Sequence, residues 1–179
     1  MTFIPKQFHF HAGVTHANPK NMGSEHTYDG RHFDLELHIV HLNMDPKTQD
    51  FFKAAVIGVM FKAVDTDKLT YADKFLRALF SGDVVDCERG LIDHLDLIHR
   101  YVYRGSLTTP PYSEFLLWNM VARIPRINYE TLKLFRHEVS ILDQSGKKTD
   151  KLFGQSNRDV QPLNGRKIYE IIEGPGPHE

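Results

Sequence analysis

Cysteine is nearly absent from this chain, which has a single one, Cys87, among 179 residues. One cysteine cannot form a disulfide within the chain, so the fold is not expected to depend on a disulfide framework. Low cysteine use also suits a reducing compartment, and we expect a cytoplasmic location. The first residues, Met-Thr-Phe-Ile-Pro-Lys, lack the apolar run of a secretory signal. No apolar stretch approaches the length of a membrane span.

Blocks of like charge are also missing, and the formal net charge is −1. This balance points to neither a nucleic acid nor a membrane surface as a partner. Apolar residues make up 41% and charged residues 25% of the chain, as in an ordinary soluble globular protein. A chain of this length most simply forms one domain. We expect that domain to cover residues 1–170 and a flexible tail, rich in Gly and Pro, to cover 171–179.

Hydrophobic patterning predicts a mainly β domain with peripheral helices. A helical spacing of apolar residues begins at Thr70 and reaches Phe80, where Gly82 can end the helix. Asn128 can cap a second helix that runs through Leu132, Phe135 and Val139. Asp29-Gly30 is typical of a tight turn. Alternating or β-branched stretches predict strands over residues 3–11, 34–43, 54–64, 99–104 and 114–122.

The most informative stretch is Gln7-Phe8-His9-Phe10-His11. In a strand, successive side chains point to opposite faces, so His9 and His11 project together while the phenylalanines face the other way. Two such imidazoles can bind one metal ion while the phenylalanines hold the strand in a core. The alternative is a pair of partly buried histidines that make ordinary hydrogen bonds. A third ligand would distinguish these interpretations.

His38 is the natural third ligand, since it lies on a predicted strand with Glu36 on the same face. Three neutral imidazoles leave the fourth position of a tetrahedral zinc ion open, which is the arrangement of catalytic zinc. Ligating histidines usually donate their other N–H to an oxygen, and Gln7 beside His9 and Glu36 beside His38 are placed for this. His41 falls on the opposite face. We interpret the histidines without a partner pattern as surface or satisfied core residues: His16, His32, His94, His99 and His137.

Five segments, in order, resemble the α-class carbonic anhydrases. They are Gln-Phe-His-Phe-His from Gln7, Gly-Ser-Glu-His-Thr-x-Asp-Gly from Gly23, Glu-Leu-His-x-Val-His from Glu36, Gly-Ser-Leu-Thr-Thr-Pro-Pro from Gly105 and Gln-Pro-Leu-Asn-Gly-Arg from Gln161. The resemblance implies that family's central twisted mixed sheet. It also implies Zn²⁺ bound by His9, His11 and His38, and reversible hydration of CO2 to bicarbonate and a proton by hydroxide that the zinc activates.

The resemblance implies roles for further residues. Thr108 would accept a hydrogen bond from the hydroxide and donate a hydrogen bond to Glu25. This pair of hydrogen bonds would orient the nucleophile. Thr109 would border the same pocket. An apolar wall for CO2 would consist of Val40, Val56, Leu107 and Trp118. The strand pattern itself indicates only that Val40 and His38 lie on the same face of their strand. The alternative interpretation is that all four apolar residues belong to the ordinary hydrophobic core.

The chain departs from the family pattern chiefly at its start, where members of the family carry a substantial portion before the first metal-binding strand. We therefore expect an N-terminally truncated domain with strands whose backbone is exposed and open to a partner chain or a dimer. An incomplete or alternatively started enzyme would have this form. So would a non-catalytic binding or assembly subunit on the same fold. A purely structural zinc site is disfavoured because a fourth protein ligand is lacking.

Overall fold

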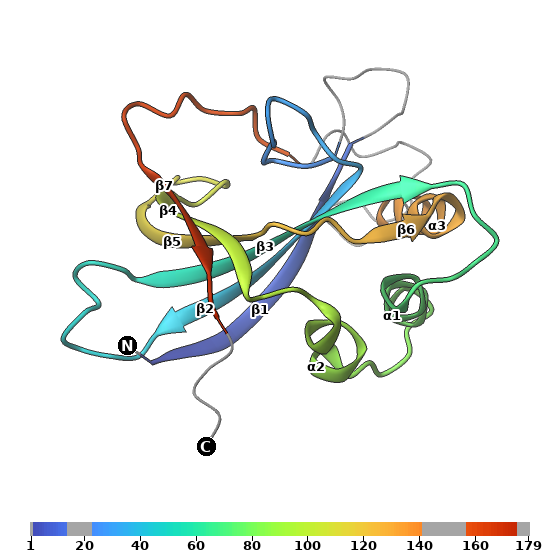
Figure 1. Ribbon diagram of the computed structural model, residues 1–179. Coiled ribbons are helices and arrows are strands. Elements are labelled where there is room, and N and C mark those ends of the chain that lie inside the picture. Colours follow the sequence, from blue (N-terminus) through green and yellow to red (C-terminus); the bar gives the residue numbers. More distant parts are fainter. Residues whose placement is uncertain (1, 14–22, 141–156, 175–179) are drawn as a thin grey trace.

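The computed structural model describes residues 2–13, 23–140 and 157–174, and its main feature is one mixed, twisted sheet (Figure 1). The strand order is β1-β2-β3-β5-β4-β7, and β6 pairs with the far end of β3. Strand β3 runs parallel to β5 and β6, while the other neighbours are antiparallel. The strands are β1 Phe3–Ala12, β2 Leu35–Asn43, β3 Ala54–Val64, β4 His99–Ser106, β5 Glu114–Val121, β6 Arg126–Asn128 and β7 Ile168–Ile172.

Short helices cover one end of the sheet (Figure 1). Helix α1 spans Tyr71–Phe80 and begins with a capping box between Thr70 and Asp73. Helix α3 spans Tyr129–Ser140, where the Asn128 side chain accepts a hydrogen bond from the Glu130 N–H at 2.7 Å. Between α1 and β4 lie α2, Cys87–Gly90, and the 3₁₀ turn η2, Ile92–His94. In the part of the chain that the structure describes, no helix has both the length and the apolarity to cross a bilayer.

Apolar side chains gather in two clusters, one on each face of the sheet. The larger lies between the sheet and the helices and includes Leu35, Phe61 and Leu76. The smaller lies on the opposite face and includes Val56, Met60 and Trp118. Residues at alternate positions of β2 and β3 enter different clusters, as the period of two along a strand requires. The polar groups described below lie beside the smaller cluster.

The sequence predicted the long elements well and the short ones poorly. The five predicted strands and both predicted helices are present within two residues of their expected bounds, and Asp29-Gly30 forms a turn in which both residues have positive φ. Four elements fell in segments expected to be loop or short extended pieces: α2, η2, β6 and β7. Because β7 pairs with β4 as far as Ile172, the first two residues of the expected tail belong to the sheet. Residues 175–179 and His16 lie outside the described residues.

Among the described residues strand β1 lies at the edge of the sheet, and one of its two phenylalanines differs from the expectation. Phe10 packs against Phe80 and Phe135, so it reaches the larger cluster. Phe8, two residues earlier, is 38% exposed, because the helices cover the sheet only near the other end of β1. One phenylalanine therefore anchors the strand, instead of the two that the alternation predicted.

Candidate metal centre

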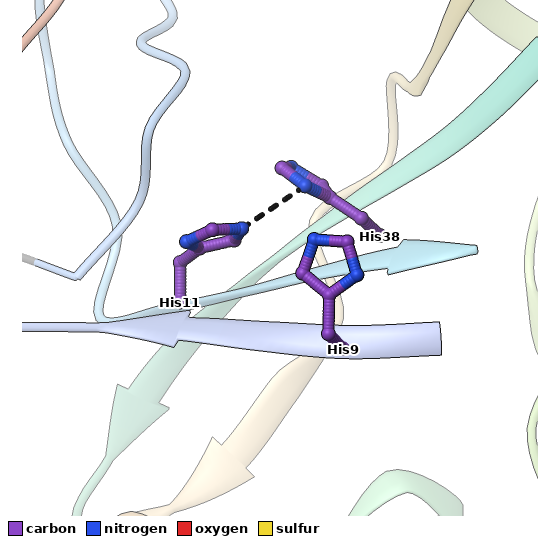
Figure 2. A group of neighbouring side chains, drawn as sticks. All are labelled: His9, His11 and His38. Atoms are coloured by element: carbon purple, nitrogen blue, oxygen red, sulfur yellow. Dashed lines mark hydrogen bonds between the residues drawn. The ribbon is translucent and has the colours of Figure 1, made fainter. Parts of the chain in front are cut away.

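Three imidazoles converge above strands β1 and β2 (Figure 2). The strand register places His9 directly opposite His38, and His11 projects from the same face of β1 two residues further on. His11 Nε2 lies 3.1 Å from His38 Nδ1. One nitrogen from each ring can be chosen so that all three lie within 4.8 Å of one another. The His11 and His38 side chains are buried and that of His9 is half-buried, so the site opens on the His9 side.

The donor set and its spacing fit Zn²⁺. A tetrahedral zinc ion with Zn–N bonds of about 2.0–2.1 Å holds two ligand nitrogens about 3.3 Å apart, close to the 3.1 Å between His11 and His38. Neutral imidazoles are needed for this, and burial favours them. Burial lowers the pKa of His9 to about 4, helped by the neighbouring His38 and His11. Burial also lowers the pKa of His38, against the opposing effect of Glu36.

Glu36 determines which nitrogen of His38 faces the other imidazoles. Its Oε1 lies 2.6 Å from His38 Nε2, so this nitrogen carries the proton and Nδ1 presents its lone pair to His11. The side chain of Glu36 is fully buried. Burial opposes ionisation, but the charges and hydrogen bonds of His26 and His38 outweigh it and hold the pKa of Glu36 well below its usual range. Glu36 is therefore a carboxylate at neutral pH.

His26 belongs to the same network, although it was assigned no role from the sequence. Its Nδ1 lies 2.6 Å from Glu36 Oε1 and its Nε2 lies 2.6 Å from the hydroxyl of Tyr103. The backbone N–H groups of Glu25 and His26 both donate to Glu36 Oε2 at 2.9 Å. His26 and Tyr103 are 77 residues apart in the chain. No local sequence pattern predicts a contact between residues so far apart in the chain.

Glu25 lies next to two of the imidazoles, and Thr108 lines a cavity together with Glu25. Glu25 Oε1 accepts a hydrogen bond from the backbone N–H of Arg158 at 2.8 Å. Its Oε2 is buried without a hydrogen-bond partner and lies 3.3 Å from His11 Nε2 and 3.9 Å from His38 Nδ1. Burial raises the pKa of Glu25, whereas hydrogen bonds from the Thr108 side chain and the Arg158 N–H lower it. A buried carboxylate oxygen that faces two candidate ligand nitrogens is an environment that a cation would complete.

The four residues expected to form an apolar wall do meet on the histidine face. Val56 pairs with Val40 on one side and Trp118 on the other, and Leu107 packs against the same cluster. The Trp118 ring lies 4.7 Å from the ring of His38, centroid to centroid. Val56 and Trp118 are almost fully buried, whereas Val40 and Leu107 are half-buried. Both the substrate-wall interpretation and the core interpretation fit this placement.

The remaining predicted residues are less closely tied to the cluster. Gln7 is exposed beside His9 and makes no side-chain hydrogen bond within the described part of the chain. Thr109 is exposed, whereas Thr108 is half-buried. Other histidines have separate partners: His41 contacts the Ile39 carbonyl, His32 the Ser24 carbonyl, His94 stacks on Tyr71 and His99 lies 2.7 Å from Glu170.

Comparison with known proteins places this geometry in a family. The model of the eukaryotic-type carbonic anhydrases matches residues 1–172. The chain belongs to this carbonic anhydrase family. It is 35% identical over 182 residues to carbonic anhydrase 6 of Canis lupus familiaris, covering 93% of this chain and 53% of that protein. It is 33% identical over 171 residues to a putative carbonic anhydrase 3 of Caenorhabditis elegans, covering 93% of this chain and 63% of that protein.

A solved carbonic anhydrase has the same fold. The structure is the α-carbonic anhydrase from Thermovibrio ammonificans in complex with the inhibitor sulfanilamide. Its TM-score is 0.63 at 32% sequence identity, and the alignment covers 93% of this chain and 62% of that one. The α-class resemblance and the mixed sheet expected from it are thus confirmed. The chain spans between about half and two thirds of the length of these carbonic anhydrases.

Proposed function

We propose that this protein binds one Zn²⁺ through His9, His11 and His38 and catalyses the reversible hydration of CO2 to bicarbonate and a proton. The observation that carries the proposal is the convergence of three imidazoles, whose candidate ligand nitrogens lie within 4.8 Å of one another. Glu25 Oε2, which is buried without a hydrogen-bond partner, faces two of these imidazoles, His11 and His38. Membership of the carbonic anhydrase family supports the same activity. Zinc supplies a Lewis acid that lowers the pKa of a water molecule to about 7, a value known from carbonic anhydrases as a class.

Thr108 and Glu25 orient the nucleophile. The Thr108 hydroxyl has one proton, and in the proposed arrangement that proton forms the hydrogen bond to the Glu25 carboxylate. The Thr108 oxygen then has only lone pairs to offer, so it accepts from a group that carries a proton, as hydroxide does. The Arg158 N–H holds Glu25 in place from the other side at 2.8 Å. This arrangement disfavours anions without a proton and fixes the direction of attack.

An apolar surface beside the nucleophile suits CO2, which has no net dipole. Val40 and Leu107 are its accessible members, since Val56 and Trp118 are almost fully buried. Thr109 borders the same region on the loop that follows β4. In this arrangement the apolar residues hold the substrate, and Thr108 holds the nucleophile.

One sample can test the proposal. The purified chain is analysed for zinc and, in the same preparation, assayed for CO2 hydration by stopped flow with a pH indicator. We expect one zinc per chain and a hydration rate that falls when a chelator removes the metal and returns when zinc is restored. A preparation without stoichiometric zinc at neutral pH would refute the metal site. A zinc-loaded chain with no hydratase activity would refute the enzymatic role.

A second function, an assembly subunit on the carbonic anhydrase fold, is favoured by the edge position of β1. The outer side of β1 has no neighbouring strand among the described residues, and two apolar residues of this strand, Ile4 and Phe8, are 49% and 38% exposed. Such an edge can pair with a strand of another chain or of a second copy. This alternative predicts a stable dimer or complex by light scattering, together with negligible hydration by the zinc-loaded chain.

A further inference from the structure

Three arginines line a hollow of about 430 Å³. Arg104 comes from β4, whereas Arg158 and Arg166 come from the segment that leads into β7, drawn orange-red in Figure 1. Glu114 is the one acidic side chain among the described residues that line the hollow. The lining therefore has an excess of positive charge.

Each guanidinium lies over an aromatic ring. The distances from guanidinium carbon to ring centroid are 5.0 Å for Arg104 over Phe52, 4.1 Å for Arg158 over Tyr112 and 5.6 Å for Arg166 over Tyr103. Stacking holds the plane of a guanidinium and leaves its N–H edge available to an oxyanion.

The donors of these arginines are largely unused. Among the described residues, none of the three forms an ion pair with a carboxylate. Arg158 donates no side-chain hydrogen bond within that part of the chain, and Arg166 uses two donors, to the carbonyls of Pro162 and Leu163. A guanidinium has five N–H donors, so most of them can bind a ligand.

The hollow continues toward the proposed catalytic groups. Arg158, Arg166, Ser106 and Gln161 also line a second cavity, of about 160 Å³, whose wall includes Glu25 and Thr108. An anion released at Thr108 therefore meets Arg158 and Arg166 next. Planar trigonal oxyanions match the fork of a guanidinium, which can donate two parallel hydrogen bonds to them.

We propose that this arginine hollow binds bicarbonate and holds the product of the reaction beside the metal centre. The choice of bicarbonate among oxyanions rests on the proposed function, whereas the anion site itself rests on the three arginines. An anion held there stays in a positive field after it leaves Thr108.

Nuclear magnetic resonance of the ¹⁵N-labelled, zinc-loaded chain tests this directly. Sodium bicarbonate is added at constant ionic strength, and the arginine Nε–Hε signals are followed, each assigned by the variant that removes it. We expect the signals of Arg158 and Arg166 to shift saturably with a common Kd. The signal of Arg126, which does not line the hollow, should remain in place. Shifts that are linear, or equal for all arginines, would overturn the site.

Variants and a second anion complete the test. Arg158→Gln should weaken bicarbonate binding, read from the Arg166 signal, by about tenfold, as expected for the loss of a charge-assisted hydrogen bond, while Arg126→Gln leaves it unchanged. Unchanged affinity in Arg158→Gln would overturn the proposal. Inorganic phosphate that binds at least tenfold more tightly than bicarbonate would overturn the choice of ligand. Zinc content and CO2 hydration are measured on the same samples, so saturable binding by an inactive chain would refute the proposed function and leave the anion site standing.

Discussion

Replacing Glu36 with glutamine should impair metal binding through the tautomer of His38. Glu36 Oε2 accepts two backbone N–H groups, which cannot change their role, so the glutamine carbonyl oxygen must take that position. The glutamine NH2 group then occupies the position of Oε1, 2.6 Å from His38 Nε2 and from His26 Nδ1. An NH2 group donates, so His38 Nε2 must accept and its proton must move to Nδ1. That nitrogen is the one that faces His11 and the proposed metal position.

Two magnitudes follow. Loss of a carboxylate that orients a ligating histidine typically weakens metal affinity by about 10–100-fold, and we expect Glu36→Gln to fall in that range. Folding suffers as well, because the two charge-assisted hydrogen bonds of Glu36 to His38 and His26 become neutral ones, which are worth about 0.5–1.5 kcal/mol each instead of about 1.5–3. With two such bonds affected, the metal-free chain should lose roughly 2–3 kcal/mol of its free energy of unfolding.

Competition with a chromophoric chelator measures zinc affinity, and urea unfolding of the metal-free chain measures stability. Glu170→Gln is a matched control, since Glu170 Oε1 lies 2.7 Å from His99 Nε2 in a pair of the same chemistry that is exposed to solvent. The control should keep its zinc affinity and change stability by only about 0–1 kcal/mol. Glu36→Gln with wild-type zinc affinity would refute the tautomer argument.

Three further predictions concern the same centre. His38→Ala should lose both zinc and hydration, whereas His41→Ala, on the opposite face of β2, should keep both; metal analysis and stopped flow decide. Thr108→Ala should keep zinc but hydrate CO2 about a hundredfold more slowly, a loss typical of a misplaced reactant, and Thr108→Ser should recover most of the rate; equal rates in all three proteins would contradict the orienting role. The metal-free chain should lose stability as the pH falls from 6.5 toward 4. Over this range the unfolded chain binds a proton at His9, whereas the folded chain does not, because its His9 pKa is lowered to about 4. A free energy of unfolding in urea that stays constant or rises over this range would contradict the prediction.

The elements that the sequence predicted are those whose burial alternates within one segment. Strand β2 is an example, because Leu37 and His38 face opposite clusters and each is almost fully buried. Strand β7 is mostly exposed and pairs only at the sheet edge, so burial left little pattern in its sequence. Strand β6 has three residues, too few for any period to appear.

The same distinction applies to the site. His9 and His11 share a strand, and their common face follows from the backbone alone. The network of His26, Glu36 and Tyr103 depends on tertiary structure, since Tyr103 lies on β4 and His26 lies in the segment before β2. The exposure of Phe8 could not be predicted either, because it depends on where the helices end over β1. Local periodicity predicts which way a side chain points, and the long-range packing determines what it meets.

The edge position of β1 has a consequence for dynamics. An edge strand has hydrogen bonds to one neighbour only, so it opens locally at a lower free energy than a strand paired on both sides. Two of the proposed ligands lie on β1 and the third on β2, so an ion bound by all three would fasten the edge strand to its neighbour. Occupancy at a concentration one hundred times Kd adds about 2.7 kcal/mol to that closed state. Amide exchange should then slow most along Phe8–Ala12 when zinc is added, and metal availability would control how often β1 separates from β2 and exposes the backbone of β2.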